Sequence, residues 1–160
     1  MALEIERKWL IDPQAVPFDL ERAERTRIEQ SYVSFKPQVR LRSLNDERFI
    51  LTVKGKPLGE PEQESELARQ EFEFELTREA YENLRGKTEG KVLRKTRYFV
   101  PQDQGRCFEI DIYEGEFAGL AVAEMEFATL EQAESFPTPD WVLEDISADP
   151  YYRNVVMAQE

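Results

Sequence analysis

The sequence contains no histidine and only one cysteine, Cys107. The commonest general base of enzymes is therefore missing, and so are the nitrogen and sulfur ligands of a zinc site. Any metal site in this chain would be lined by oxygen atoms, which favour hard cations such as Mg²⁺, Mn²⁺ or Ca²⁺. A lone cysteine cannot form a disulfide within the chain, and this agrees with a reducing compartment. We therefore expect a cytoplasmic protein without zinc.

Long apolar runs are also absent. No stretch approaches the roughly 20 apolar residues of a membrane span, and the N-terminus lacks the basic-then-apolar order of a secretory signal. Basic residues are comparatively few, because 21 Lys and Arg stand against 33 Asp and Glu, for a formal net charge of −12. Binding to a polyanion is driven by a basic surface, so neither nucleic acid nor a membrane is expected as a partner. An anionic small molecule would need a local cluster of cations.

The composition is typical of one folded domain. The chain has 160 residues, of which 41% are hydrophobic and 34% charged. It is too apolar for a disordered chain and too charged for a membrane protein. We therefore expect residues 1–160 to form a single domain. The stretch 55–66, rich in Gly, Pro and Glu, is interpreted as a loop between two strands of that domain.

Apolar and polar residues alternate along most of the chain, which is typical of β-strands. The pattern predicts eight strands, at 3–10, 26–35, 38–44, 47–54, 68–76, 91–100, 106–113 and 121–128. Thr77 and Thr129 are predicted to cap short helices over 78–85 and 130–135, and a last helix is predicted over 149–159. The predicted fold class is mainly β (α+β), with a closed eight-stranded antiparallel β-barrel and a few flanking helices.

Seven of the eight predicted strands carry two polar, mostly charged residues two positions apart, so that each pair projects from one face. The pairs are Glu4 and Glu6, Arg40 and Arg42, Thr52 and Lys54, Glu71 and Glu73, Lys95 and Arg97, Glu109 and Asp111, and Glu124 and Glu126. A sheet with one solvated face would explain any single pair. The strands, however, divide by sign, which predicts a hydrated interior with an acidic side and a basic side. Such an interior suits a phosphate chain with bound cations, and its grouped carboxylates should have raised pKa values.

This ordered series resembles the CYTH superfamily, also called triphosphate tunnel metalloenzymes. The N-terminal Glu4-Ile5-Glu6-Arg7-Lys8 is similar to the ExExK signature of these proteins. Matches continue along nearly the whole chain, at Gln30, Tyr32, Arg40, Arg42, Thr52, Lys54, Arg69, Glu71, Glu73, Lys95, Arg97, Asp111, Glu124 and Glu126. The resemblance implies an eight-stranded antiparallel β tunnel that binds triphosphate compounds together with Mg²⁺ or Mn²⁺.

Three groups of site residues follow from the resemblance. It implies that metal ions are held by Glu4, Glu6, Asp111, Glu124 and Glu126. It implies that phosphate oxygens are bound by Lys8, Arg40, Arg42, Lys54, Arg69, Lys95 and Arg97, with Glu71 and Glu73 in a weaker, orienting role. It also implies a catalytic pair of Lys8 and Tyr32, in which neighbouring cations lower the pKa of the lysine so that it can accept a proton. The alternatives are that Tyr32 is a wall residue and that the whole set forms structural salt bridges.

The implied activity is metal-dependent hydrolysis of inorganic tripolyphosphate. A class IV adenylate cyclase is an alternative, although the His-Phe motif of those enzymes cannot occur in a chain without histidine. Thiamine and nucleoside triphosphates also remain open as substrates. An alternative of another class is a polyphosphate or nucleotide binding module without turnover, against which the intact pair Glu4 and Glu6 argues. The segment 151–154 is interpreted as packing, and a homodimer is left open.

Overall fold

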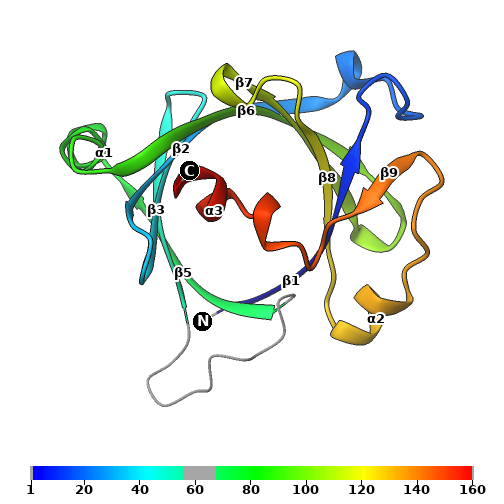
Figure 1. The fold of residues 1–160 in the computed structure, drawn as a ribbon. Helices are drawn as coiled ribbons and strands as arrows, with labels where there is room; N and C mark the ends of the chain where they lie inside the picture. The colour runs from blue at the N-terminus through cyan, green and yellow to red at the C-terminus, as the bar shows by residue number, and fades with distance from the viewer. Residues whose placement is uncertain (1, 56–67, 160) are drawn as a thin grey trace.

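A computed structural model of the chain describes residues 2–55 and 68–159; at 2–4 and 68–70 it describes the backbone only. One antiparallel sheet of nine strands dominates it, in the order β5-β4-β3-β2-β6-β7-β8-β1-β9. Figure 1 shows the strands arranged around a central space. The strands are β1 (Ala2–Ile11), β2 (Glu24–Ser34), β3 (Gln38–Leu44), β4 (Arg48–Gly55), β5 (Ala68–Leu76), β6 (Glu89–Pro101), β7 (Cys107–Glu114), β8 (Ala121–Glu126) and β9 (Val142–Asp145).

Strand β1 pairs with three other strands. Residues 6–10 pair with β8, residues 9–11 pair with β9, and residues 2–5 pair with residues 68–71 of β5. The prediction of a mainly β, antiparallel fold with few helices is thus confirmed, whereas the predicted number of strands is too low by one. The missed strand, β9, has four residues after a proline-rich segment, too few to show an alternating pattern.

The two short helices lie where the sequence predicts them. Helix α1 (Arg78–Arg85) begins after Thr77, whose Oγ1 accepts a hydrogen bond from the Ala80 amide at 3.1 Å. Helix α2 (Leu130–Ser135) begins in the same way after Thr129. Three single turns of 3-10 helix lie in the connections, at η1 (Leu20–Arg22), η2 (Asp103–Gly105) and η3 (Gly115–Phe117). Side-chain capping therefore sets where both helices begin.

The predicted last helix is interrupted. A 3-10 turn, η4 (Pro150–Tyr152), is separated from helix α3 (Asn154–Gln159) by Arg153, whose backbone is extended. The Tyr152 carbonyl, which a continuous helix would use internally, instead accepts a hydrogen bond from Lys8 Nζ at 3.1 Å. A single helix over 149–159 is therefore wrong, because a contact to β1 competes with the helical ladder. In Figure 1 this C-terminal segment, in red, lies across the central space.

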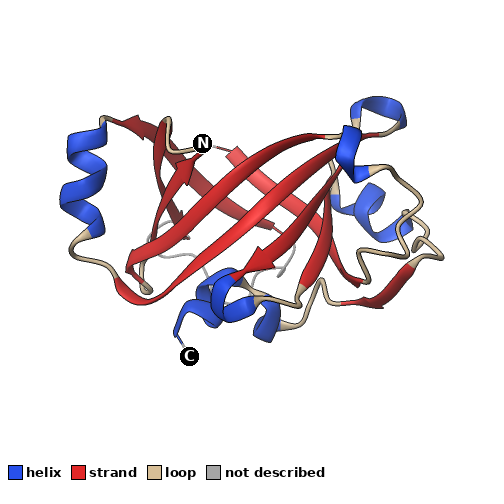
Figure 2. Cartoon of the chain, turned by 90° about the horizontal axis from the view of Figure 1, so that it is seen from above, coloured by secondary structure: helices blue, strands red, loops and turns tan. Residues whose placement is uncertain are grey.

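Most of the apolar core lies on the outer face of the sheet. One cluster, around Trp9, Phe108 and Met125, packs beneath α2 and the segment that follows it, and a smaller one packs beneath α1. Arg7 also faces outward and joins three segments: its guanidinium donates to the carbonyls of Ala133 and Phe136 and to the Asp145 carboxylate. Figure 2 shows α1, on the left, and α2, on the right, outside the tilted strands. The inner face of the strands is thereby left to polar side chains, except near α3.

A third cluster lies on the inner face. Val155, Met157 and Ala158 of the C-terminal segment pack on Tyr32, Leu93, Tyr113, Val122 and Ile146. The interior is therefore apolar beneath α3 and polar beyond it. None of the helices that the structure describes is long and apolar enough to cross a membrane.

Candidate active site

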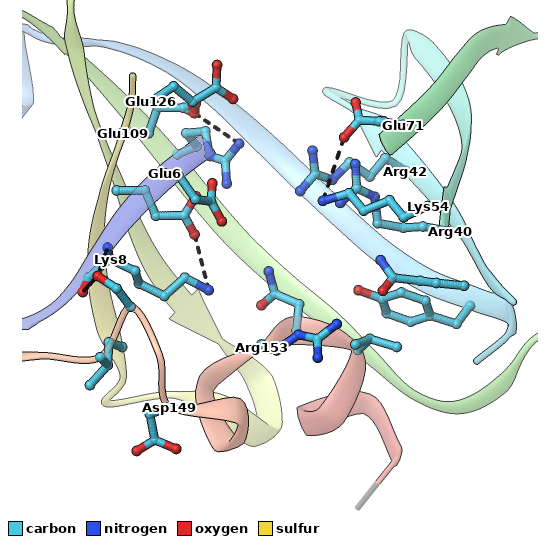
Figure 3. A pocket seen from close by; sticks show the side chains of 18 of the residues that line it. Glu6, Lys8, Arg40, Arg42, Lys54, Glu71, Glu109, Glu126, Asp149 and Arg153 are labelled. Carbon is cyan, nitrogen blue, oxygen red and sulfur yellow. Dashed lines mark hydrogen bonds and ion pairs between the residues drawn. The ribbon is translucent and has the colours of Figure 1, made fainter. Parts of the chain in front are cut away.

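A cavity of about 290 Å³ lies between the inner faces of the strands and the C-terminal segment. Figure 3 shows how its charged side chains are distributed: Glu6, Glu109 and Glu126 lie on one side, and Arg40, Arg42 and Lys54 face them from the other. The acidic residues come from β1, β7 and β8, and the basic ones from β3 and β4. The division by sign that the sequence predicts is present in part, because Glu71 lies beside the cations while Lys8 and Arg97 lie beside the carboxylates.

The structure brings most of the predicted site residues together. The cavity is lined by Glu6, Lys8, Tyr32, Arg40, Arg42, Lys54, Glu71, Glu73, Arg97, Glu109, Glu124 and Glu126. The side chains of Glu4 and Arg69 lie outside the described part of the chain, although their backbones are cross-strand partners. Lys95 and Asp111 do not line the cavity, because both side chains are completely buried.

On the acidic side, carboxylates are direct cross-strand neighbours. Glu6 stands opposite Glu126, and Glu109 stands opposite Glu124. Like charges in such positions destabilise a sheet unless a cation lies between or beside them. Two cations of the protein compensate part of this negative charge. Lys8 Nζ lies 3.4 Å from Glu124 Oε1, and Arg97 Nη1 lies 3.2 Å from Glu109 Oε2. A further cation would add to this compensation, because four carboxylates meet on this side.

The pKa shifts of these carboxylates are mixed. Burial raises the pKa of Glu109, which Arg97 opposes and the neighbouring carboxylates reinforce. Burial would also raise the pKa of Glu124, but Lys8 and Arg97 lower it below its usual value. The expectation that grouped carboxylates have raised pKa values is thus confirmed at Glu109 and wrong at Glu124, because a lysine is its nearest partner.

On the basic side, three cations from adjacent strands face the cavity. Burial, followed by the charges of Arg40 and Arg97, lowers the pKa of Arg42 to about 10. Arg40 Nη2 donates to Thr52 Oγ1 at 3.4 Å, and Lys54 Nζ lies 3.6 Å from Glu71 Oε2. Grouped cations of this kind gain from a bound polyanion, because its oxygens accept their hydrogen bonds and neutralise their charge.

Beneath the cavity, Asp111 holds two buried cations. Its carboxylate accepts from Arg97 Nε at 2.7 Å and from Arg97 Nη2 at 2.9 Å, and Lys95 Nζ lies 2.8 Å from its Oδ2. Burial lowers the pKa of Lys95 to about 7, although Asp111 opposes the shift. Arg97, followed by Lys95, lowers the pKa of Asp111 against the effect of burial. In this arrangement Asp111 orients Arg97, a role that spacing along the strand alone could not distinguish from metal binding.

Lys8 and Tyr32 both line the cavity, and the pKa of each is raised. Burial would lower the pKa of Lys8, yet Glu124 and Glu6 raise it above its usual value. The expected lowering of the pKa of Lys8 is therefore wrong, since its neighbours are carboxylates. The lowering occurs instead at Lys95. Burial raises the pKa of Tyr32, whose hydroxyl accepts a hydrogen bond from Gln30 Nε2 at 2.7 Å.

The C-terminal segment supplies cavity residues that sequence reasoning missed. Asp149, Arg153 and Asn154 line the cavity, and Asn154 Oδ1 accepts a hydrogen bond from Tyr113 at 2.5 Å. Figure 3 shows Arg153 between Lys8 and Arg40. The sequence signal was the polar pair Arg153 and Asn154 ahead of an apolar stretch, which the prediction of one packing helix overlooked.

The CYTH domain family model matches residues 2–148. The chain belongs to the CYTH family. The inorganic triphosphatase of Nitrosomonas europaea is 31% identical to it over 164 residues, covering 97% of this chain and 96% of the relative. The inorganic triphosphatase of Acetivibrio thermocellus is 34% identical over 157 residues, covering 96% and 92%. Among solved structures, an inorganic triphosphatase has a TM-score of 0.67 and 29% identity, with 98% of each chain covered.

The donor set of this CYTH chain suits a hard divalent cation. Within the described ranges, no group of three or more acidic or cysteine side chains is placed to hold a metal ion. Mg²⁺, however, is usually held by one or two carboxylates together with water and substrate phosphate. Glu6, Glu124 and Glu126 offer only oxygen atoms, and the like-charged cross-strand pairs would be relieved by a cation. These residues therefore fit Mg²⁺ or Mn²⁺ bound jointly with a phosphate chain.

Proposed function

We propose that the protein is a divalent-metal-dependent inorganic triphosphatase, which hydrolyses tripolyphosphate to pyrophosphate and phosphate. The observation that carries the proposal is the cavity in which carboxylates of β1, β7 and β8 face cations of β3 and β4. A phosphate chain and a divalent cation complement those two sides. The names of the two bacterial relatives support the same activity. We further propose that residues 1–160 act as one domain in which eight strands, closed through the β1 and β5 pairing, form a tunnel around the substrate.

The phosphate chain would be bound by the cations of the cavity. Arg40, Arg42 and Lys54 would bind one part of the chain, and Arg97, held in place by Asp111, would bind another. Arginine forks and lysine ammonium groups both donate to phosphate oxygens. Arg69, whose side chain is not described, stays a prediction for the same role, and Lys95 would support Arg97 from beneath rather than touch substrate.

The divalent cation would be held by Glu6, Glu124 and Glu126, with Glu4 as a predicted fourth ligand. A bound Mg²⁺ or Mn²⁺ supplies Lewis-acid neutralisation of phosphate charge and lowers the pKa of a coordinated water. Lys8 stays protonated between Glu124 and the Tyr152 carbonyl, so it would neutralise developing charge instead of accepting a proton. Tyr32 would contact the phosphate chain from the opposite wall.

A comparison of substrates tests the proposal. Phosphate release would be measured from tripolyphosphate, ATP and thiamine triphosphate with Mg²⁺ or Mn²⁺, and cyclic AMP would be assayed as a product of ATP. We expect the highest kcat/KM with tripolyphosphate and no cyclic AMP. Tripolyphosphate binding without release would favour a binding module, and cyclic AMP formation would favour a cyclase. A cytoplasmic location stays a prediction.

A further inference from the structure

Gln30 connects two residues of the cavity wall without lining the cavity itself. It lies on β2, and its side chain is fully buried. Arg42 Nε donates to Gln30 Oε1 at 2.8 Å, and Gln30 Nε2 donates to Tyr32 Oη at 2.7 Å. Arg42 belongs to the neighbouring strand β3, directly opposite Gln30 in the register. One amide thus joins a cation and a phenol that both face the proposed substrate.

The chemistry of the arginine fixes the polarity of this chain of hydrogen bonds. A guanidinium carries only donors, so the group of Gln30 that faces Arg42 must be the oxygen. The amide nitrogen then faces Tyr32, and because that nitrogen can only donate, Tyr32 Oη must accept. The phenolic hydrogen is therefore directed away from Gln30. Among the residues that the structure describes, no acceptor is bonded to it, and the Tyr32 side chain lines the cavity.

We propose that Gln30 is a positioning residue that makes Tyr32 a hydrogen-bond donor to the phosphate chain and holds the guanidinium of Arg42 in the cavity wall. The proposal rests on the proposed triphosphatase function and adds a residue to it that does not touch substrate. In this role the Tyr32 hydroxyl donates a hydrogen bond. A general base, by contrast, would have to accept a proton. The donated hydrogen bond would go to a phosphate oxygen, which is charged and accepts strongly.

The variant Gln30→Glu reverses the polarity at nearly constant shape. A carboxylate accepts at both oxygens, so the Arg42 contact is kept while the Tyr32 hydroxyl turns its hydrogen toward position 30. The phosphate chain then loses one hydrogen bond to a charged acceptor, which corresponds to a loss of roughly tenfold to a hundredfold in affinity. Gln30→Met, of similar length and without hydrogen-bonding groups, removes the contacts to both Arg42 and Tyr32, and it tests the positioning role if the carboxylate prevents folding.

A double-mutant cycle separates positioning from a general structural effect. Binding of a tripolyphosphate analogue with non-hydrolysable imido bridges would be measured calorimetrically in the presence of Mg²⁺, for the wild type, Gln30→Glu, Tyr32→Phe and the double variant. Phosphate release with Mg²⁺ would be measured in parallel. We expect Gln30→Glu to weaken binding in the wild type and to have little further effect in Tyr32→Phe. Ser31→Ala is the matched control, because Ser31 is equally buried on the same strand and does not line the cavity.

Each outcome decides between the two proposals. An equal loss from Gln30→Glu in both backgrounds, or a loss no larger than that of Ser31→Ala, would overturn the role of Gln30. If the wild type binds the analogue with Mg²⁺ but releases no phosphate from tripolyphosphate, the proposed function is wrong while the binding cycle still decides on Gln30. A wild type that binds no analogue in the presence of Mg²⁺ overturns both.

Discussion

Among single residues, Asp111 illustrates how charge is held beneath the cavity. Three contacts between 2.7 and 2.9 Å join it to Arg97 and Lys95, and its side chain is completely buried. Buried ion pairs gain little over apolar packing when intact, but removing one partner leaves an uncompensated charge in a poorly solvated place. The Asp111 carboxylate is therefore expected to stabilise the fold as well as to orient Arg97.

Replacing Asp111 by asparagine should lower the free energy of unfolding by about 3–5 kcal/mol, because the buried Arg97 loses its counterion and Lys95 loses its nearest acceptor. Urea denaturation measures this loss. Glu126→Gln, at an exposed position, is the control and should change stability by less than about 0.5 kcal/mol. A stable Asp111→Asn protein that has lost only its metal affinity would show that Asp111 is a metal ligand, as the resemblance implies.

Lys95 should make stability depend on pH. In the folded protein its pKa is lowered to about 7, whereas the unfolded lysine keeps a value near 10.5. Between these values the unfolded state binds more protons, so the free energy of unfolding should rise with pH, by at most about 1.4 kcal/mol per unit. Denaturation of the wild type and Lys95→Met from pH 6.5 to 9.5 tests this. A rise of the same slope in both proteins would contradict the assignment to Lys95.

Alternation along the strands was enough to predict most of the cavity wall, since residues two apart share a face. It could not show that Lys95 and Asp111 are buried while Arg97, two residues away from Lys95, is reached by solvent. That difference depends on how deeply each side chain is buried in the folded sheet, which the pattern along one strand does not record. The pKa of Lys8 was misjudged for a similar reason, because its partner Glu124 comes from a strand more than 100 residues away.

Among the elements, the packing of the C-terminal helix α3 on β6 depends on one glycine. Gly90 of β6 has φ of +70°, and a Cβ added there would lie 2.2 Å from the Ala158 carbonyl oxygen. No side chain fits at that distance, so the approach of α3 to β6 requires glycine. The end of the chain, and with it Arg153 and Asn154, is thereby held over the cavity.

Gly90→Ala should lower the free energy of unfolding, because the clash adds to the cost of the positive φ. Gly105→Ala is a matched control, since Gly105 has φ of +71° and no atom within 4 Å of an added Cβ. The difference between the two variants isolates the clash and should be about 1–3 kcal/mol, measured by thermal or urea unfolding. Equal losses in the two variants would mean that α3 shifts away at no cost.

Local signals in the sequence were sufficient for α1 and α2, because a threonine side chain caps each helix at its first turn. They were insufficient for β9 and for the break at Arg153. Strand β9 is held against β1 in part by the hydrogen bond from Arg7 to Asp145. The break at Arg153 depends on the hydrogen bond from Lys8 to the Tyr152 carbonyl. Both contacts join the two ends of the chain, so no pattern within a short window could predict them.

At the scale of the whole molecule, the net charge of −12 belongs to the chain as a whole, whereas the cations of β3 and β4 are concentrated at the cavity. The overall acidity discourages long polyanions, while the cavity concentrates cations where a short phosphate chain can enter. The acidic wall opposite would repel the same chain without a divalent cation between them. Substrate and metal are therefore expected to bind together.

Phosphate release from tripolyphosphate, by the wild type and by Glu126→Gln, each with Mg²⁺ and with EDTA, tests this account most directly. We predict release by the wild type with Mg²⁺, none with EDTA, and a fall of at least about tenfold in kcat/KM for Glu126→Gln at unchanged stability. Release in EDTA, or full activity in Glu126→Gln, would contradict a reaction that depends on a metal ion held by Glu6, Glu124 and Glu126.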